Sequence, residues 1–220
     1  MNRQLEGASA AHQRLLSALD PLEGSRLTDE MVGRDSRLVG WTVGHVLAHL
    51  AHNADGMTRM FEGAEAGAVA DQYPGGLTGR NADIERDAPR SADDHIAAVR
   101  SSIYRLEGAW SRAREAWLGS GRLGTGAVVP IADLPMRRWR EVEVHMGDLG
   151  ITELGLDGFG VWSNDYVGHD LRRLSMLFKA RGPMGLADLP EAVRSLEPRS
   201  RLAWLLGRLE VAGAGPAGVL

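Results

Sequence analysis

Cysteine is absent from this chain of 220 residues. Its absence excludes disulfide bonds, thiolate zinc sites, iron–sulfur clusters and a cysteine nucleophile. Lysine is almost absent as well, and Schiff-base chemistry would have to rest on Lys179 alone. Arginine and the two acidic residues supply the other charges and leave a formal net charge of −4. Because phosphate-binding surfaces are usually basic, we expect no nucleic-acid partner.

Long apolar runs are also missing. No run approaches the ~18–20 residues that span a bilayer, so we expect no membrane association. The first residues lack the apolar core of a signal peptide. Together with the missing cysteines, this predicts a cytoplasmic protein, present as a monomer or a weak dimer.

Apolar residues recur at helical spacing in four long segments. These segments predict helices over about residues 3–20, 43–67, 92–118 and 131–149, with Thr42 and Ser91 as N-caps of the second and third. Residues 68–90 read as a long loop with a short helix near 81–88, and residues 119–130 as a loop or a short extended piece. Four helices of this length are typical of a bundle.

After Gly150 the sequence becomes glycine-rich and irregular over residues 150–162. An amphipathic pattern predicts a helix over 163–180, and SRLAWLLGR predicts a short buried helix. We expect strands in GPMGLADLP and in LEVAG. The predicted fold class is α+β, with a four-helix bundle at 1–152 and a small α/β appendage at 153–220.

The candidate chemistry lies in the second and fourth helices. His45, His49 and His52 are separated by four and three residues, and Glu141 and His145 by four, so each set shares a helix face. One histidine of the second helix could meet Glu141 and His145 in the bundle core. Three such ligands leave a position open, as in a catalytic zinc site.

Spacing alone leaves a second interpretation open. A solvated polar face with ordinary hydrogen-bonded histidines explains the pattern nearly as well, because a Glu-x-x-x-His pair is common by chance. Glu143 lies about 200° from Glu141 around the helix and is expected to face away from the candidate site.

Two segments add a resemblance. GWTVGHVLAHLAHNADG, followed about ninety residues later by RWREVEVHMGDLG, resembles the DinB-like superfamily and, more narrowly, the mycothiol-dependent maleylpyruvate isomerases. The resemblance covers about residues 5–150 and implies a DinB-like bundle. It implies that His49, Glu141 and His145 bind zinc. It also implies that His45 is not a ligand, and that His52 lies beside the site or on the surface.

Two arginines extend the resemblance. Tyr73, Arg80 and Asn81 match a Tyr and a later Arg-Asn pair of the family, and Arg208 matches an arginine after an apolar helix near the C-terminus. By this resemblance Arg80 and Arg208 bind substrate carboxylates, which the planar guanidinium does well.

The activity implied is the cis–trans isomerisation of maleylpyruvate to fumarylpyruvate. Zinc would be the cofactor, although the ligand set also suits Ni, Fe or Co, and mycothiol would be the thiol cosubstrate. The partners would then be a small-molecule substrate and a low-molecular-weight thiol. Two alternatives stay open: a mycothiol S-transferase that releases the thiol adduct, and a non-catalytic metal-binding bundle.

Overall fold

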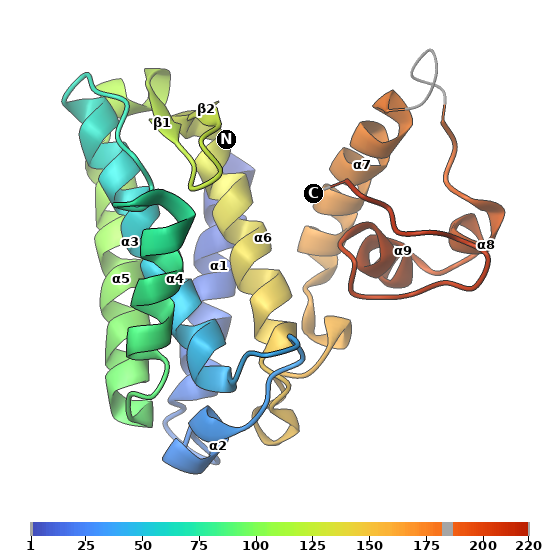
Figure 1. The fold of residues 1–220 in the computed structure, drawn as a ribbon, viewed down its shortest axis with the longest axis horizontal. Helices are drawn as coiled ribbons and strands as arrows, with labels where there is room; N and C mark the ends of the chain where they lie inside the picture. The colour runs from blue at the N-terminus through green and yellow to red at the C-terminus, as the bar shows by residue number, and fades with distance from the viewer. Residues whose placement is uncertain (1, 182–186, 220) are drawn as a thin grey trace. The chain divides into compact units, whose positions relative to one another are not determined.

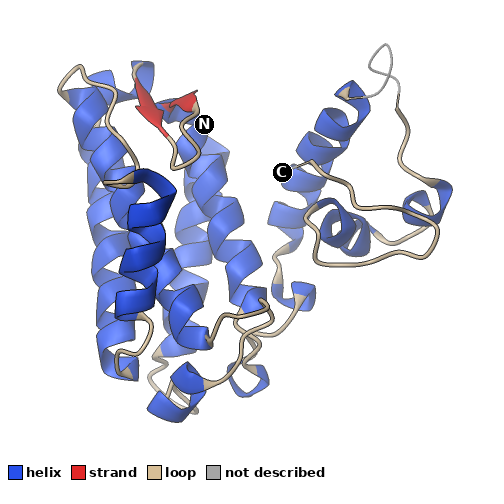
Figure 2. Cartoon of the chain, viewed as in Figure 1, coloured by secondary structure: helices blue, strands red, loops and turns tan. Residues whose placement is uncertain are grey.

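The computed structural model describes residues 2–181 and 187–219 and divides the chain into two compact units, Met1–Asp157 and Gly158–Leu220. The boundary predicted after residue 152 falls near the end of the first unit. Helices dominate, and a two-stranded sheet is the only sheet among the described residues, which confirms the α+β class (Figure 2). None of the described helices is long and apolar enough to cross a membrane.

Four long helices build the first unit: α1 (Asn2–Leu19), α3 (Val43–Glu65), α5 (Ala92–Arg112) and α6 (Leu134–Asp148). Helix α3 packs mainly against α5, and α1 against α6. Figure 1 shows α3 and α5 running in the same direction, so the chain must return between them. Helix α4 (Gly76–Asp87), packed against α3, makes that return.

Side-chain caps fix where two of these helices begin. The Thr42 hydroxyl accepts from the backbone N–H of His45 at 3.4 Å, and His45 Nδ1 accepts from the backbone N–H of Thr42 at 3.1 Å. This is a capping box with histidine in the place of the usual glutamate. Ser91 caps α5 by accepting from the backbone N–H of Asp94 at 3.2 Å. Both predicted N-caps are confirmed.

Helix α4 is the main departure from the expected secondary structure. The sequence predicted a loop with a short helix near 81–88, whereas the helix already begins at Gly76. Ile84 and Asp87 are its only buried residues, so it carries no apolar stripe to reveal it. Gly75, with φ of 74°, turns the chain into the helix in a conformation that favours glycine.

The remaining elements of the first unit are short. Strands β1 (Ser120–Arg122) and β2 (Val128–Pro130) pair antiparallel and place the expected extended piece in a hairpin. The other short elements are α2 (Asp29–Gly33) and the 3-10 turns η1 (Glu115–Leu118), η2 (Ile131–Asp133) and η3 (Thr152–Leu154). The third predicted helix therefore ends at Arg112 rather than near residue 118, because Ala113 turns to extended backbone.

The second unit contains η4 (Phe159–Val161), α7 (Asn164–Ala180), α8 (Glu191–Arg194) and α9 (Pro198–Leu205). Helix α7 packs against α9, and the rings of Phe178 and Trp204 meet at 5.5 Å. The strand predicted at LEVAG is wrong. Only an isolated bridge joins Val211 to Ala214, because a turn at Gly213 leaves no partner strand. Most of the strand predicted in GPMGLADLP lies outside the described residues.

Candidate metal centre

Glu141 and His145, which the spacing paired, and His49, which the resemblance selected, lie together between α3 and α6. His49 Nε2 is 2.9 Å from Glu141 Oε2, and His145 Nε2 is 3.5 Å from the same oxygen. One potential ligand atom of each residue lies within 4.8 Å of the other two. The rings of His49 and His145 meet edge to face at 4.7 Å. We call these three residues the triad.

Burial and pairing prepare two members of the triad, His49 and Glu141, for a divalent cation. Burial lowers the pKa of His49 to about 4, so this imidazole is neutral. Burial opposes ionisation of Glu141, but hydrogen bonds from His145 and His49 outweigh it and hold the Glu141 pKa well below its usual range. Burial also lowers the pKa of His145, yet Asp148 and Glu141 together raise it. A metal must therefore compete with a proton mainly at His145.

Outer partners orient both imidazoles. His145 Nδ1 is 2.9 Å from Asp148 Oδ2, which leaves Nε2 turned toward Glu141. Carboxylate–histidine pairs of this kind commonly support metal-bound histidines. Arg80 Nη2 lies 3.0 Å from His49 Nδ1. Because a guanidinium only donates, Nδ1 accepts and the ring hydrogen sits on Nε2, facing Glu141.

The donor chemistry of the triad fits a divalent metal. Two imidazole nitrogens and one carboxylate oxygen form a ligand set that zinc and several first-row metals accept. Asp148 supplies the outer contact that such sites need, and it was not singled out from the sequence. Its position three residues after His145 was the available signal, since i,i+3 neighbours share a helix face.

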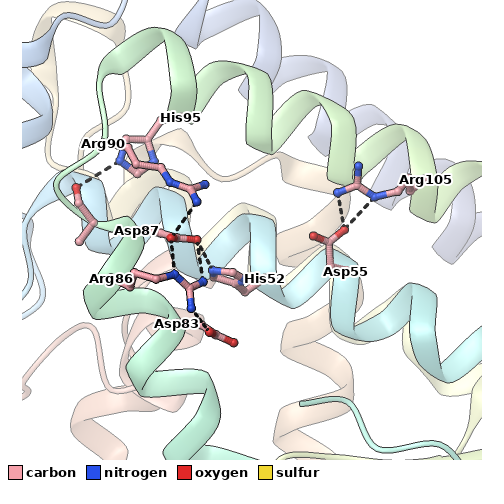
Figure 3. Close-up of polar contacts among 9 residues, drawn as sticks. His52, Asp55, Asp83, Arg86, Asp87, Arg90, His95 and Arg105 are labelled. Carbon is pink, nitrogen blue, oxygen red and sulfur yellow. Dashed lines mark hydrogen bonds and ion pairs between the residues drawn. The ribbon is translucent and has the colours of Figure 1, made fainter. Parts of the chain in front are cut away.

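The two other histidines of α3 have different partners. His45 caps its own helix and stacks on Trp41 with the ring centroids 6.1 Å apart. His52 Nε2 lies 2.9 Å from Asp87 at the end of α4. Arg86 and Arg90 bind the same carboxylate, at 3.0 and 2.9 Å (Figure 3). We call these four residues the Asp87 cluster.

The triad lines a cavity of about 290 Å³. Three side chains on α3 and three on α6 line it, and within each helix they are four residues apart. In full, the α3 residues are His49, Asn53 and Met57, and the α6 residues are Arg137, Glu141 and His145. Gln72, Tyr73, Leu77, Arg80 and the tip of the hairpin complete the lining. Asn53 and Arg137 were not singled out from the sequence, although the same spacing of four leads to both.

Arg80 reaches the triad from α4. Its guanidinium lies over the Trp41 ring, 5.6 Å from the centroid, and donates to Asn81 Oδ1 at 2.9 Å. Arg208 belongs to the second unit, where its Nη1 donates to the Leu206 carbonyl at 3.3 Å. Its contact with a substrate stays a prediction.

Glu143 lies on the opposite face of α6, as expected, but that face is not solvated. Its carboxylate is fully buried and receives Arg14 at 2.8 and 3.2 Å and the Trp139 indole N–H at 3.2 Å. Glu143 therefore helps to join α6 to α1, while Glu141 faces the cavity.

Fold and site together define a helical bundle with a candidate metal centre between two facing helices. A sequence-family model described as "Mycothiol maleylpyruvate isomerase N-terminal domain" matches residues 8–150. The chain therefore belongs to this family, and the resemblance seen in the sequence is confirmed.

Solved structures agree on the fold. A crystal structure titled as the mycothiol-dependent maleylpyruvate isomerase has a TM-score of 0.69 and 23% identity, covering 82% of this chain and 71% of that one. A crystal structure of a histidine-to-alanine mutant of that enzyme has the same TM-score and identity, covering 82% and 72%. At this identity the likeness shows the fold alone. None of the curated proteins matches.

Proposed function

We propose that the protein is a metal- and thiol-dependent cis–trans isomerase of maleylpyruvate, with mycothiol as the thiol. The observation that carries the proposal is the convergence of His49, Glu141 and His145 on one cavity that Arg80 also enters. Family membership supports the thiol and the reaction. A metal site in a cavity that two arginines, Arg80 and Arg137, also line suits an anionic, electrophilic substrate.

The triad would hold the metal, with zinc as the first choice and another divalent ion as the alternative. When bound, the metal would supply a Lewis acid that lowers the pKa of a thiol by several units and keeps its sulfur anionic. The two imidazoles enter this role neutral and the carboxylate charged, so the metal and its protein ligands together carry a charge of about +1.

Metal loading would also redirect Arg80. A neutral imidazole that ligates through Nε2 carries its hydrogen on Nδ1. Nδ1 can then no longer accept from Arg80, so the contact now seen at 3.0 Å is lost. The guanidinium becomes available to a substrate carboxylate, for which its planar fork is well suited.

Substrate and product of this reaction are isomers, and the thiol is regenerated in each turnover. The thiolate adds to one carbon of the cis double bond, and the electron pair of that bond moves to the conjugated carbonyl oxygen. The resulting single bond rotates. The enolate electrons then re-form the double bond in the trans geometry and expel the thiolate. Arg80 would hold a substrate carboxylate and stabilise the enolate charge.

A mycothiol S-transferase is the second candidate. Met57, Leu77 and Leu123 make part of the cavity wall apolar, which suits an uncharged electrophile. In that case the adduct is released instead of the free thiol. A non-catalytic metal-binding bundle is the third candidate, and it predicts no thiol-dependent turnover.

Loss of maleylpyruvate absorbance, measured with and without mycothiol, tests the proposal. The zinc-loaded protein should turn over only with thiol, and the thiol should be recovered. Consumption of thiol in step with substrate would identify the transferase. Absence of turnover by zinc-loaded protein, at saturating thiol, would contradict the isomerase.

A further inference from the structure

Asn53 lies in the cavity one helical turn beyond His49. It follows His49 by four residues on α3, lines the same cavity and is only 3% exposed. A buried amide needs hydrogen-bond partners for both its oxygen and its nitrogen. Those partners define which way the amide faces.

Arg138 fixes the orientation of the Asn53 amide. Arg138 Nη1 donates to Asn53 Oδ1 at 3.0 Å. Because a guanidinium has no acceptor atom, the oxygen of the amide must face Arg138 and the NH₂ group must face away from it. Tyr73 lies on that other side. Burial and the charge of Glu141 raise the pKa of its hydroxyl, and a hydrogen bond from Asn53 acts in the opposite direction.

Arg138 is itself held by contacts from two helices, α1 and α3. Its Nη1 also donates to the Leu50 carbonyl at 2.9 Å, and its Nε donates to His12 Nε2 at 2.9 Å. His12 Nε2 therefore accepts, and its Nδ1 carries the hydrogen toward Glu107 Oε1 at 2.8 Å. Burial lowers the pKa of His12 to about 4, which keeps the imidazole neutral as this arrangement requires.

The charge balance around this chain of contacts favours an anion in the cavity. Arg138 is fully buried, and the groups bonded to it, His12, the Leu50 carbonyl and Asn53, are neutral. A buried cation with neutral partners is stabilised by negative charge nearby. Glu141, Asp55 and Glu107 supply such charge from outside its direct contacts, and a metal on the triad would take up most of the charge of Glu141.

We infer that Asn53 binds substrate through its side-chain NH₂ group, donating to an anionic oxygen of a dicarboxylate-class ligand. Arg138, backed by His12 and Glu107, is the positioning residue that presents the NH₂ group to the cavity. The inference rests on the proposed function only in that both use this cavity. It concerns which group binds the ligand, and not which reaction follows.

Binding of maleate to the zinc-loaded protein, followed by calorimetry, provides the test. Asn53→Asp retains an acceptor for Arg138 and so retains the fold, but it replaces the donor with a negative charge. We expect maleate to bind about 10- to 100-fold more weakly, as for loss of a hydrogen bond to a charged group. Thr58→Val is the matched control, because Thr58 is buried on α3 and bonds only the Ala54 carbonyl. Its maleate affinity should not change.

A double-mutant cycle tests the positioning role. Arg138→Met alone should weaken maleate binding, whereas in the Asn53→Ala background it should add little further loss, because Arg138 acts through Asn53. If the Arg138→Met variant does not fold, Arg138→Lys is used in its place. Zinc stoichiometry should be unchanged in every variant. Additive losses would contradict the positioning role.

The outcomes separate this inference from the proposed function. Unchanged maleate affinity in Asn53→Asp, or no maleate binding to the zinc-loaded wild type, would overturn the inference even if the isomerase assay succeeds. Maleate binding that depends on Asn53, without any isomerase turnover, would retain the inference and refute the proposed reaction.

Discussion

Helix α3 carries two histidine–carboxylate pairs of nearly equal geometry and different character. His49 meets Glu141 at 2.9 Å, and His52 meets Asp87 at 2.9 Å. The groups that lower the Glu141 pKa are two histidines, whereas those that lower the Asp87 pKa against the effect of burial include two arginines. Imidazoles can lose a proton and bind a metal, but guanidinium groups cannot.

The comparison shows that a histidine beside a carboxylate does not by itself make a metal site. The triad has a third ligand, and it is the one group of potential metal ligands found among the described residues. The Asp87 cluster is instead an ion-pair network, in which Arg86 also binds Asp83 (Figure 3). It attaches the end of α4, the helix that carries Arg80, to α3.

Replacing histidine by glutamine at two positions of α3, three residues apart, should give the largest contrast in zinc content and turnover. His49→Gln removes a ligand, and we expect zinc to fall from about one equivalent to a small fraction, with turnover reduced more than about 1000-fold. His52→Gln should keep the zinc and most of the activity. Elemental analysis after zinc loading and gel filtration measures the contrast. Equal zinc content in both variants would refute the triad as the metal centre.

Lowering the pH should weaken metal binding by the triad in two stages. The His145 pKa is raised above the ordinary histidine value of about 6.5, so at any pH below that value a metal must displace one proton, and affinity should fall about tenfold per pH unit. His49 stays neutral until about pH 4, where a second proton joins and the slope steepens. Competition titrations with a zinc chelator at several pH values measure these slopes. An affinity independent of pH between about 7 and 5 would contradict the assignment of His145.

Asp87→Asn should affect stability more than metal binding. The substitution removes a buried charge that joins α4 to α3, so we expect the free energy of unfolding to fall by about 1–3 kcal/mol. Zinc affinity should stay within about threefold, because the triad belongs to α3 and α6. Turnover should fall by a few fold through the looser placement of Arg80. Urea unfolding and zinc titration of one preparation separate these effects, and a loss of zinc would show that the two regions are coupled.

His52→Gln should give the smallest effect. His52 is partly exposed and contributes one of several contacts to Asp87, so we expect a loss of about 0.5–1 kcal/mol in unfolding free energy. Denaturant unfolding of His52→Gln and Asp87→Asn, measured side by side, shows how much of the stability of the Asp87 cluster comes from His52. A loss as large as that of Asp87→Asn would mean that the two arginines contribute little.

The helical spacing of residues in the sequence predicted the four long helices and the shared face of Glu141 and His145. Apolar residues at helical spacing define the helices, and the spacing of four places Glu141 and His145 on one face. Spacing could not decide which histidine of α3 is used. The resemblance to the family selected His49, and the structure places it beside Glu141.

Other features depend on contacts that a single sequence does not display. Only the second half of helix α4 was predicted, because its docking depends on Ile84 and on the ion pairs of Asp87 instead of an apolar stripe. Glu143 was placed on the correct face, but only the packing of Arg14 and Trp139 shows that this face is buried. Asn53 gains its significance from Arg138, which lies far from it in the sequence.

X-ray absorption at the zinc edge, recorded before and after addition of mycothiol, would show whether the thiol sulfur binds a metal held by the triad. We expect nitrogen and oxygen ligands at about 2.0–2.2 Å, and a new sulfur scatterer at about 2.3 Å once the thiol is added. Because the chain contains no cysteine, it has no thiolate of its own, and the spectrum recorded before mycothiol is added shows any contribution from the thioether of Met57 in the same cavity. A first shell that stays free of sulfur at saturating mycothiol would contradict the thiol-dependent metal site.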